Sequence, residues 1–147
     1  MELRDNTVGE LLREVTGRYP EATALVDIAL DGTVGREWNY RQLLETSERL
    51  AGVLASRFAP GERVVVWAPN IPEWLFLEYA CAFSGLVLVT ANPSFQEKEL
   101  RYVLEQSGAV ALFLVDTFRG NTMADIAQRA VEGNRRIHEV VLSLIHI

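Results

Sequence analysis

The spacing of apolar residues near the N-terminus predicts an amphipathic helix. Thr7 and Glu10 fit a capping box at its start, and Pro20 stands where the helical pattern ends. The apolar positions that repeat at helical spacing are Val8, Leu11, Leu12, Val15 and Tyr19.

A β-hairpin and a second helix are predicted next. Residues 23–30 and 34–40 are strand-like runs around Asp31-Gly32, a pair that supplies the positive φ angles of a tight turn. Asn39 and Gln42 then form a second capping pair, and the helix ends before Pro60. The face of this helix that we expect to be buried carries Leu43, Ser47, Leu50, Leu54 and Phe58.

From residue 63 onward, apolar strand-like runs alternate with helical segments. The runs begin near residues 63, 86, 109 and 137, and their continuous apolar character is typical of strands covered on both faces. Successive β-α-β units with right-handed crossovers produce such spacing. We therefore predict an α/β fold with a parallel sheet built from β-α-β units, preceded by the N-terminal helix and the hairpin.

Asparagines follow the first two of these strands. Asn70 is placed to cap a helix that starts at Ile71, and Asn92 precedes Ser94 and Glu97, which fit another capping box. Open parallel sheets bind ligands beyond the carboxyl ends of their strands, where both asparagines lie. Because capping alone explains them, we interpret both as caps rather than ligand contacts.

Other candidate residues also have simpler structural explanations. Asp116 ends the third strand, but the partner acids and the lysine of a phosphoacceptor site are missing, which favours a cap or turn. Cys81 and His138 could serve as nucleophile and base, yet Cys81 falls in a helix expected to pack on the sheet. Arg135-Arg136 is expected to be solvated surface. Aromatic residues that indicate core or an interface are Trp67, Trp74, Phe76 and Tyr79.

Composition and charge narrow the function classes. The chain has 147 residues, 49% of them hydrophobic, which is typical of one globular domain. A net charge of -6 and a single lysine, Lys98, disfavour a nucleic-acid surface. No apolar stretch approaches the ~20 residues of a membrane helix, and the first residues lack a signal core, so we expect a cytoplasmic protein. One cysteine and two histidines disfavour a disulfide or zinc site.

Two segments carry a family resemblance. "WNYRQL" (Trp38 to Leu43) and "AFSGLVLVTANP" (Ala82 to Pro93) match early core motifs of the adenylate-forming (AMP-binding) superfamily. Asn39 and Gln42 replace that family's usual threonine and glutamate, and both changes preserve a capping pair. The chain closely resembles the N-terminal portion of this superfamily over residues 7–132, and "TANPSFQEKELRYVL" is most similar to fatty-acyl-CoA synthetases.

The resemblance implies a two-step reaction in a longer parent enzyme. There, with magnesium present, a carboxylate attacks the α-phosphate of ATP to give an acyl-adenylate and pyrophosphate, and the thiol of coenzyme A then displaces AMP. The family's phosphate-binding loop, which ends in Pro-Lys, comes from later segments that do not occur in residues 1–147. We therefore expect a truncated N-terminal portion that is inactive alone, with no catalytic, cofactor-binding or metal residue and with the remainder of the adenylation domain as partner.

The end of the chain fits the family less well. Residues 143–147, "SLIHI", resemble translated sequencing-adaptor sequence, and we expect the natural protein to diverge before about residue 143.

Two alternatives from other classes remain open. The chain could be an independent flavodoxin-like module that binds a small ligand at the strand ends. It could also be a non-catalytic interaction domain that uses its aromatic surface.

Overall fold

Helices and strands alternate along the chain nearly as the apolar pattern predicts. The computed structural model describes residues 5–29 and 31–142. Within them, the sheet strands β3, β4, β5 and β8 begin within two residues of the predicted positions. The elements are α1 (Val8–Arg18), β1 (Thr23–Ile28), β2 (Val34–Asn39), α2 (Tyr40–Ala55), β3 (Arg63–Trp67), α3 (Pro72–Ser84), β4 (Val87–Ala91), α4 (Glu97–Ser107), β5 (Ala111–Leu114), β6 (Thr117–Phe118), β7 (Asn121–Thr122), α5 (Met123–Val131) and β8 (Glu139–Leu142).

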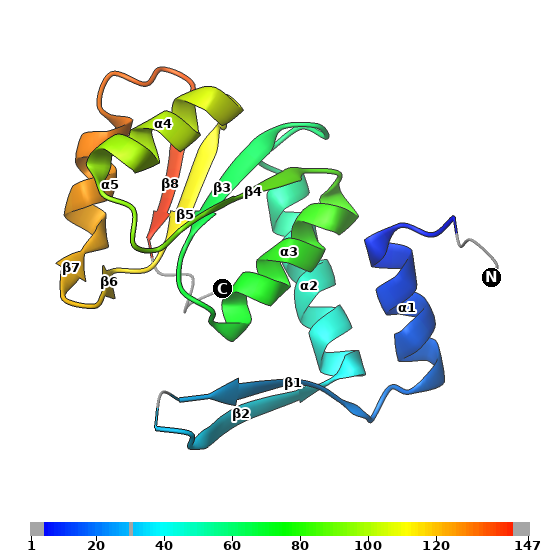
Figure 1. The fold of residues 1–147 in the computed structure, drawn as a ribbon. Helices are drawn as coiled ribbons and strands as arrows, with labels where there is room; N and C mark the ends of the chain where they lie inside the picture. The colour runs from blue at the N-terminus through cyan, green and yellow to red at the C-terminus, as the bar shows by residue number, and fades with distance from the viewer. Residues whose placement is uncertain (1–4, 30, 143–147) are drawn as a thin grey trace.

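A parallel sheet forms the centre of the molecule. Its strand order is β4-β3-β5-β8, and all of its neighbouring strands pair in parallel. Helices α4 and α5 cover one face, whereas α2 and α3 lie on the other (Figure 1). The predicted α/β fold, with a parallel sheet preceded by a helix and a hairpin, is confirmed.

The two central strands carry the core. In β3 and β5, every residue from Val64 to Trp67 and from Ala111 to Leu114 is at most 3% exposed. Helix α2 presents the predicted residues Leu43, Ser47, Leu50 and Leu54 to this core, and Phe58, which follows the end of the helix at Ala55, is buried as well. The continuous apolar runs therefore reflect helices on both faces of the sheet.

The hairpin β1-β2 is antiparallel, as predicted, but its turn differs. Of the described turn residues, Gly32 has a positive φ of 84°, whereas Asp31 does not. The Asp31 carboxylate instead accepts a hydrogen bond from the Thr33 N–H, and the Ala29 N–H donates to the Thr33 carbonyl. The turn is longer than the two-residue turn that Asp-Gly suggested.

A second, very short hairpin was not predicted. Strands β6 and β7 pair antiparallel, with Arg119 and Gly120 at positive φ angles of 49° and 81° in the turn between them. A strand of two residues is too short to show the alternation of apolar and polar residues by which strands are recognised, so the sequence pattern did not reveal β6 and β7.

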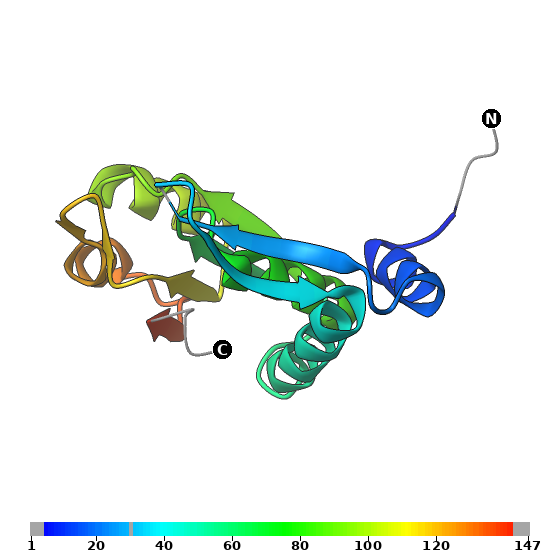
Figure 2. The ribbon, with the colours of Figure 1, turned by 90° about the horizontal axis from the view of Figure 1, so that it is seen from below.

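Helix α1 packs through Gly9, Leu12 and Thr16, of which only Leu12 belongs to the predicted apolar face. The capping box of Thr7 and Glu10 is confirmed, with the Glu10 N–H donating to Thr7 Oγ1 at 3.2 Å. The predicted face is wrong in part: Val8, Leu11 and Tyr19 are exposed, whereas the buried residues are Gly9, Leu12 and Thr16. Seen from below, α1 lies at one end of the molecule and α5 at the opposite end (Figure 2).

The close contact of Gly9 with α3 gives a testable prediction. A Cβ at Gly9 would lie 2.7 Å from two ring carbons of Phe83, whose ring also sits 4.5 Å below the Arg13 guanidinium. We expect Gly9→Ala to lower the free energy of unfolding by about 1–3 kcal/mol through overpacking. Urea denaturation followed by circular dichroism measures this change.

The matched control lies in the same helix. No heavy atom lies within 4 Å of a Cβ built at Gly17, so Gly17→Ala should stabilise the helix by about 0.5–1 kcal/mol. Equal stabilisation by both substitutions would contradict the packing of α1 on Phe83.

Candidate functional site

The carboxyl ends of the strands bring three sequence candidates to one edge of the sheet. Trp67, the last residue of β3, pairs in register with Ala91 of β4 and Leu114 of β5. Asn70, Asn92 and Asp116 follow these strand ends within a few residues, and all three are exposed. The structure therefore confirms their predicted location.

The predicted role of Asn70 as a helix cap is wrong. Helix α3 begins at Pro72, so the cap position falls on Ile71, whose side chain makes no capping hydrogen bond. Proline is favoured at the first helical position because its φ is already helical and its missing N–H needs no partner there. The helix thus starts one residue later than expected. Asn70 instead lines an open hollow of about 270 Å³ beside strand β1.

The capping box predicted for Ser94 and Glu97 is also wrong. Helix α4 starts at Glu97, and the Gln96 N–H donates to Glu99 Oε2 at 3.1 Å. Before it, the Ser94 N–H donates to the Asn92 side-chain oxygen at 2.9 Å. Asn92 therefore closes a turn rather than capping a helix, because an asparagine side chain can accept a hydrogen bond from the backbone N–H two residues further on.

Asp116 marks the start of the β6-β7 excursion. It is exposed, and its backbone carbonyl accepts a hydrogen bond from the Met123 N–H at 2.9 Å. This contact joins the end of β5 to the first residue of α5. The position agrees with the turn role predicted from the sequence.

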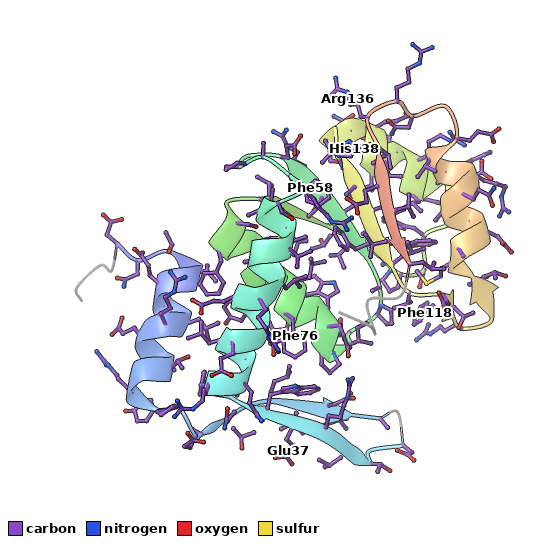
Figure 3. All side chains as sticks on the ribbon, turned by 180° about the vertical axis from the view of Figure 1, so that it is seen from behind. Glu37, Phe58, Phe76, Phe118, Arg136 and His138 are labelled. Carbon is purple, nitrogen blue, oxygen red and sulfur yellow. The ribbon has the colours of Figure 1, made fainter. Side chains whose placement is uncertain are left out.

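Cys81 and His138 occupy different environments. Cys81 in α3 is 1% exposed, and burial raises the pKa of its thiol to about 12. His138 is exposed at the start of β8, where its ring lies 6.0 Å from that of Phe58 (Figure 3). A thiol with so high a pKa is a poor nucleophile near neutral pH, so the predicted packing role of Cys81 is confirmed.

The aromatic residues mostly belong to the core. Trp67 and Phe76 are buried, Trp74 and Tyr79 are half-buried, and burial raises the pKa of Tyr79. The Trp67 indole N–H donates to the Asn92 carbonyl at 2.9 Å, which ties the ends of β3 and β4 together. The predicted core role is confirmed for Trp67 and Phe76.

The predicted solvated position of Arg135 and Arg136 is confirmed. Both are exposed and line an open hollow of about 780 Å³ at the amino ends of the strands, together with Arg63 and Glu105. This hollow lies at the opposite edge of the sheet from Asn70, Asn92 and Asp116.

The sequence analysis missed an ion pair between the hairpin and α3 in which only the carboxylate is buried. Glu73 is 3% exposed, and its carboxylate lies 2.8 Å from the Arg36 guanidinium of β2. This hydrogen bond to Glu73 is the largest cause of the raised pKa of Arg36. The partners lie far apart in the sequence, so no local pattern reveals their contact.

Residues 5–29 and 31–142 contain neither a cluster of metal-ligand side chains nor a membrane-spanning helix. No group of three or more His, Cys, Asp or Glu side chains in these ranges is placed to hold a metal ion. Likewise, no helix in the described part of the chain is both long and apolar enough to cross a membrane.

A parallel sheet with helices on both faces defines an open α/β protein, a class whose members bind their ligands beyond the carboxyl ends of the strands. The family model described as AMP-binding enzyme matches residues 12–145. The chain belongs to this family.

Curated relatives match most of the chain but only a small part of their own length. YngI of Bacillus subtilis (strain 168), which is named as an acyl-CoA synthetase, is 36% identical over 131 residues. That match covers 88% of this chain and 23% of YngI. The human mitochondrial medium-chain acyl-CoA ligase ACSF2 is 35% identical over 118 residues, which is 80% of this chain and 18% of ACSF2.

Solved structures share the fold. A fatty acyl CoA synthetase of Mycobacterium tuberculosis matches 93% of this chain with a TM-score of 0.78 at 23% identity, and the match covers 26% of that protein. MbtA of Mycobacterium smegmatis matches 95% of this chain with a TM-score of 0.79 at 28% identity, which covers 24% of MbtA. The chain therefore corresponds to the N-terminal part of larger adenylate-forming enzymes.

Proposed function

We propose that this chain is the N-terminal framework of an acyl-CoA synthetase that activates a carboxylic acid through an acyl-adenylate. The family match and the names of YngI and ACSF2 support this assignment. The observation that carries it is the 36% identity to YngI over 88% of this chain.

The small share of each relative that this chain covers supports a framework role. The chain spans less than a quarter of YngI and of ACSF2, so most of such an enzyme lies outside it. In the parent enzyme, the sheet would support the part that carries the ATP chemistry, and the remainder of the adenylation domain would be its partner. A fatty or other carboxylic acid is the substrate class that we propose for the parent.

ATP, magnesium and coenzyme A are the ligands that this function requires in the parent. Phosphoryl chemistry needs a loop of backbone N–H groups around the phosphates, with cations to stabilise the developing charge. The strand ends instead carry Asn70, Asn92 and Asp116, and the single lysine, Lys98, lies exposed on α4. These residues do not fit a triphosphate site, so we expect the 147-residue chain to be inactive alone.

ATP–pyrophosphate exchange with a series of fatty acids tests the proposal. We expect exchange from the enzyme encoded by the full reading frame and none above background from the 147-residue chain. Exchange by the chain alone would overturn the framework role, and a full-length enzyme without exchange for any carboxylic acid would overturn the assignment.

Calorimetry on the chain separates the alternatives. Tight binding of ATP, a flavin or an acyl-CoA would favour an independent binding module at the carboxyl ends of the strands. A single defined species in gel filtration would favour an interaction domain. The cytoplasmic location expected from the sequence stays a prediction.

A further inference from the structure

The open hollow at the amino ends of the strands gathers basic residues from separate segments. It has a volume of about 780 Å³ and lies against the end of α4 and the loop between α5 and β8. Arg63, at the start of β3, lines it together with Arg135 and Arg136 of that loop, and all three are exposed. Glu105 is the one acidic residue in the described lining, so three arginines against one glutamate give a net charge of +2, in a chain whose net charge is -6.

These three arginines are not neutralised by other described residues. Within residues 5–29 and 31–142, neither Arg63, Arg135 nor Arg136 forms an ion pair. Seven of the other nine arginines in these ranges pair with a carboxylate. The hollow therefore concentrates cations that the described part of the chain leaves without a counter-charge.

The helix ends beside the hollow explain only one of these cations. A guanidinium near the C-terminal end of a helix offsets the partial negative charge there. Arg136 is placed to do so, since one of its terminal nitrogens lies 2.9 Å from the point that a Cβ at Gly108, the residue after α4, would occupy (Figure 3). No hydrogen bond joins the side chain of Arg63 or Arg135 to a helix end within the described residues, so helix ends do not account for these two.

The loop that carries two of the arginines is held by hydrogen bonds. The Arg136 N–H donates to the Asn134 side-chain oxygen at 3.0 Å, and the His138 N–H donates to the Val110 carbonyl at 3.0 Å. A ligand that binds these arginines therefore has little backbone to order, which lowers the cost of binding.

Size and lining favour a small ligand over a protein surface. The volume of the hollow lies within the range of about 300–1,000 Å³ that is typical of small-molecule sites. Protein interfaces have an apolar centre rich in aromatic residues, whereas Val89 carries the one apolar side chain in the described lining. Ser107 and Asn134 add a hydroxyl and an amide, which can bond to the oxygens of a ligand.

We propose that this hollow binds a small anion that carries two or more phosphate groups. Guanidinium groups bind phosphate oxygens through paired N–H donors, and the two excess positive charges match the charge of at least two phosphates. The hollow lies at the opposite edge of the sheet from Asn70, Asn92 and Asp116. The inference goes beyond the proposed function and does not depend on it.

Hydrogen exchange of the full-length enzyme, followed by mass spectrometry, tests the proposal. The probe is inorganic tripolyphosphate, added without magnesium, and citrate is the comparison anion without phosphate. Amides in segments 105–110 and 132–138 report binding locally, so tripolyphosphate bound elsewhere in the enzyme does not enter the readout. We expect tripolyphosphate to slow exchange in both segments and citrate at the same concentration to leave it unchanged.

Substitutions in the hollow should change the dissociation constant in opposite directions. Arg135→Gln/Arg136→Gln should weaken the binding of tripolyphosphate at least about tenfold, because two charge-assisted contacts are lost. Arg49→Gln, which removes an exposed arginine of α2, is the matched control and should not change it. Glu105→Gln removes the acid from the lining and should tighten binding about two- to fivefold, a gain that loss of folding cannot produce.

The proposal is overturned if tripolyphosphate gives no local protection, if citrate protects equally well, or if the double arginine variant binds as tightly as the unmodified enzyme. Segments that are already protected without ligand and do not respond to the probe would also overturn it, because another part of the enzyme or a protein partner then fills the hollow. Local protection in an enzyme without pyrophosphate exchange would support the anion site and reject only the acyl-CoA synthetase assignment.

Discussion

Trp67→Ala should lower the free energy of unfolding by about 3–5 kcal/mol. The side chain is fully buried at the end of the central strand β3, so its removal leaves a large cavity between the layers. Because whole domains are stabilised by only about 5–15 kcal/mol, the variant should be unfolded or close to it. Thermal and urea denaturation followed by circular dichroism measure the loss.

Trp67→Phe is the matched variant. It keeps an aromatic ring in the core but removes the indole N–H that donates to the Asn92 carbonyl. Asn92 is exposed, so water can replace this donor, and we expect a loss of about 1–2 kcal/mol from the hydrogen bond and the smaller ring. A loss below about 1 kcal/mol for Trp67→Ala would contradict the fully packed core.

Arg36→Leu should destabilise the attachment of the hairpin to α3 by about 2–3 kcal/mol. The substitution leaves the Glu73 carboxylate, which is 3% exposed, without its partner at 2.8 Å. Arg36 itself is half-exposed, so we expect a loss below the range of about 3–5 kcal/mol for fully buried pairs. Arg36 also contacts Asp27 and lies over the Trp38 ring, and these contacts add to the loss.

A double-mutant cycle isolates the contribution of the pair. Glu73→Gln removes the buried charge, so adding it to Arg36→Leu should recover part of the lost stability. Hydrogen exchange of the β2 amides reports the same release locally. If the double variant is as unstable as the sum of the two single variants, the ion pair does not hold the hairpin.

Local signals in the sequence were reliable where neighbouring residues interact. The capping pairs of Thr7 with Glu10 and of Asn39 with Gln42 form as predicted, because each joins residues three positions apart. The predicted first residues of the helices that follow β3 and β4 were wrong, because several polar residues in those loops could serve as caps. At Pro72 the ring decided the first turn, and after β4 the Asn92 turn moved the start of the helix to Glu97.

The candidate site was predictable in position but not in detail. Strand ends could be recognised from the apolar runs, so Asn70, Asn92 and Asp116 were expected at one edge of the sheet. Which side chains they contact depends on loops that carry no periodic signal. The family resemblance, based on "WNYRQL" and "AFSGLVLVTANP", was confirmed by the match over residues 12–145.

By itself, the sequence determined the order of all helices and strands except the short strands β6 and β7, the parallel sheet and the family, because periodicity, turn residues and short motifs are local properties of the chain. Tertiary structure alone decided which face of α1 is buried and brought Arg36 and Glu73 together. These features join segments far apart in the chain, and their energies depend on the three-dimensional packing of surfaces that no local pattern describes.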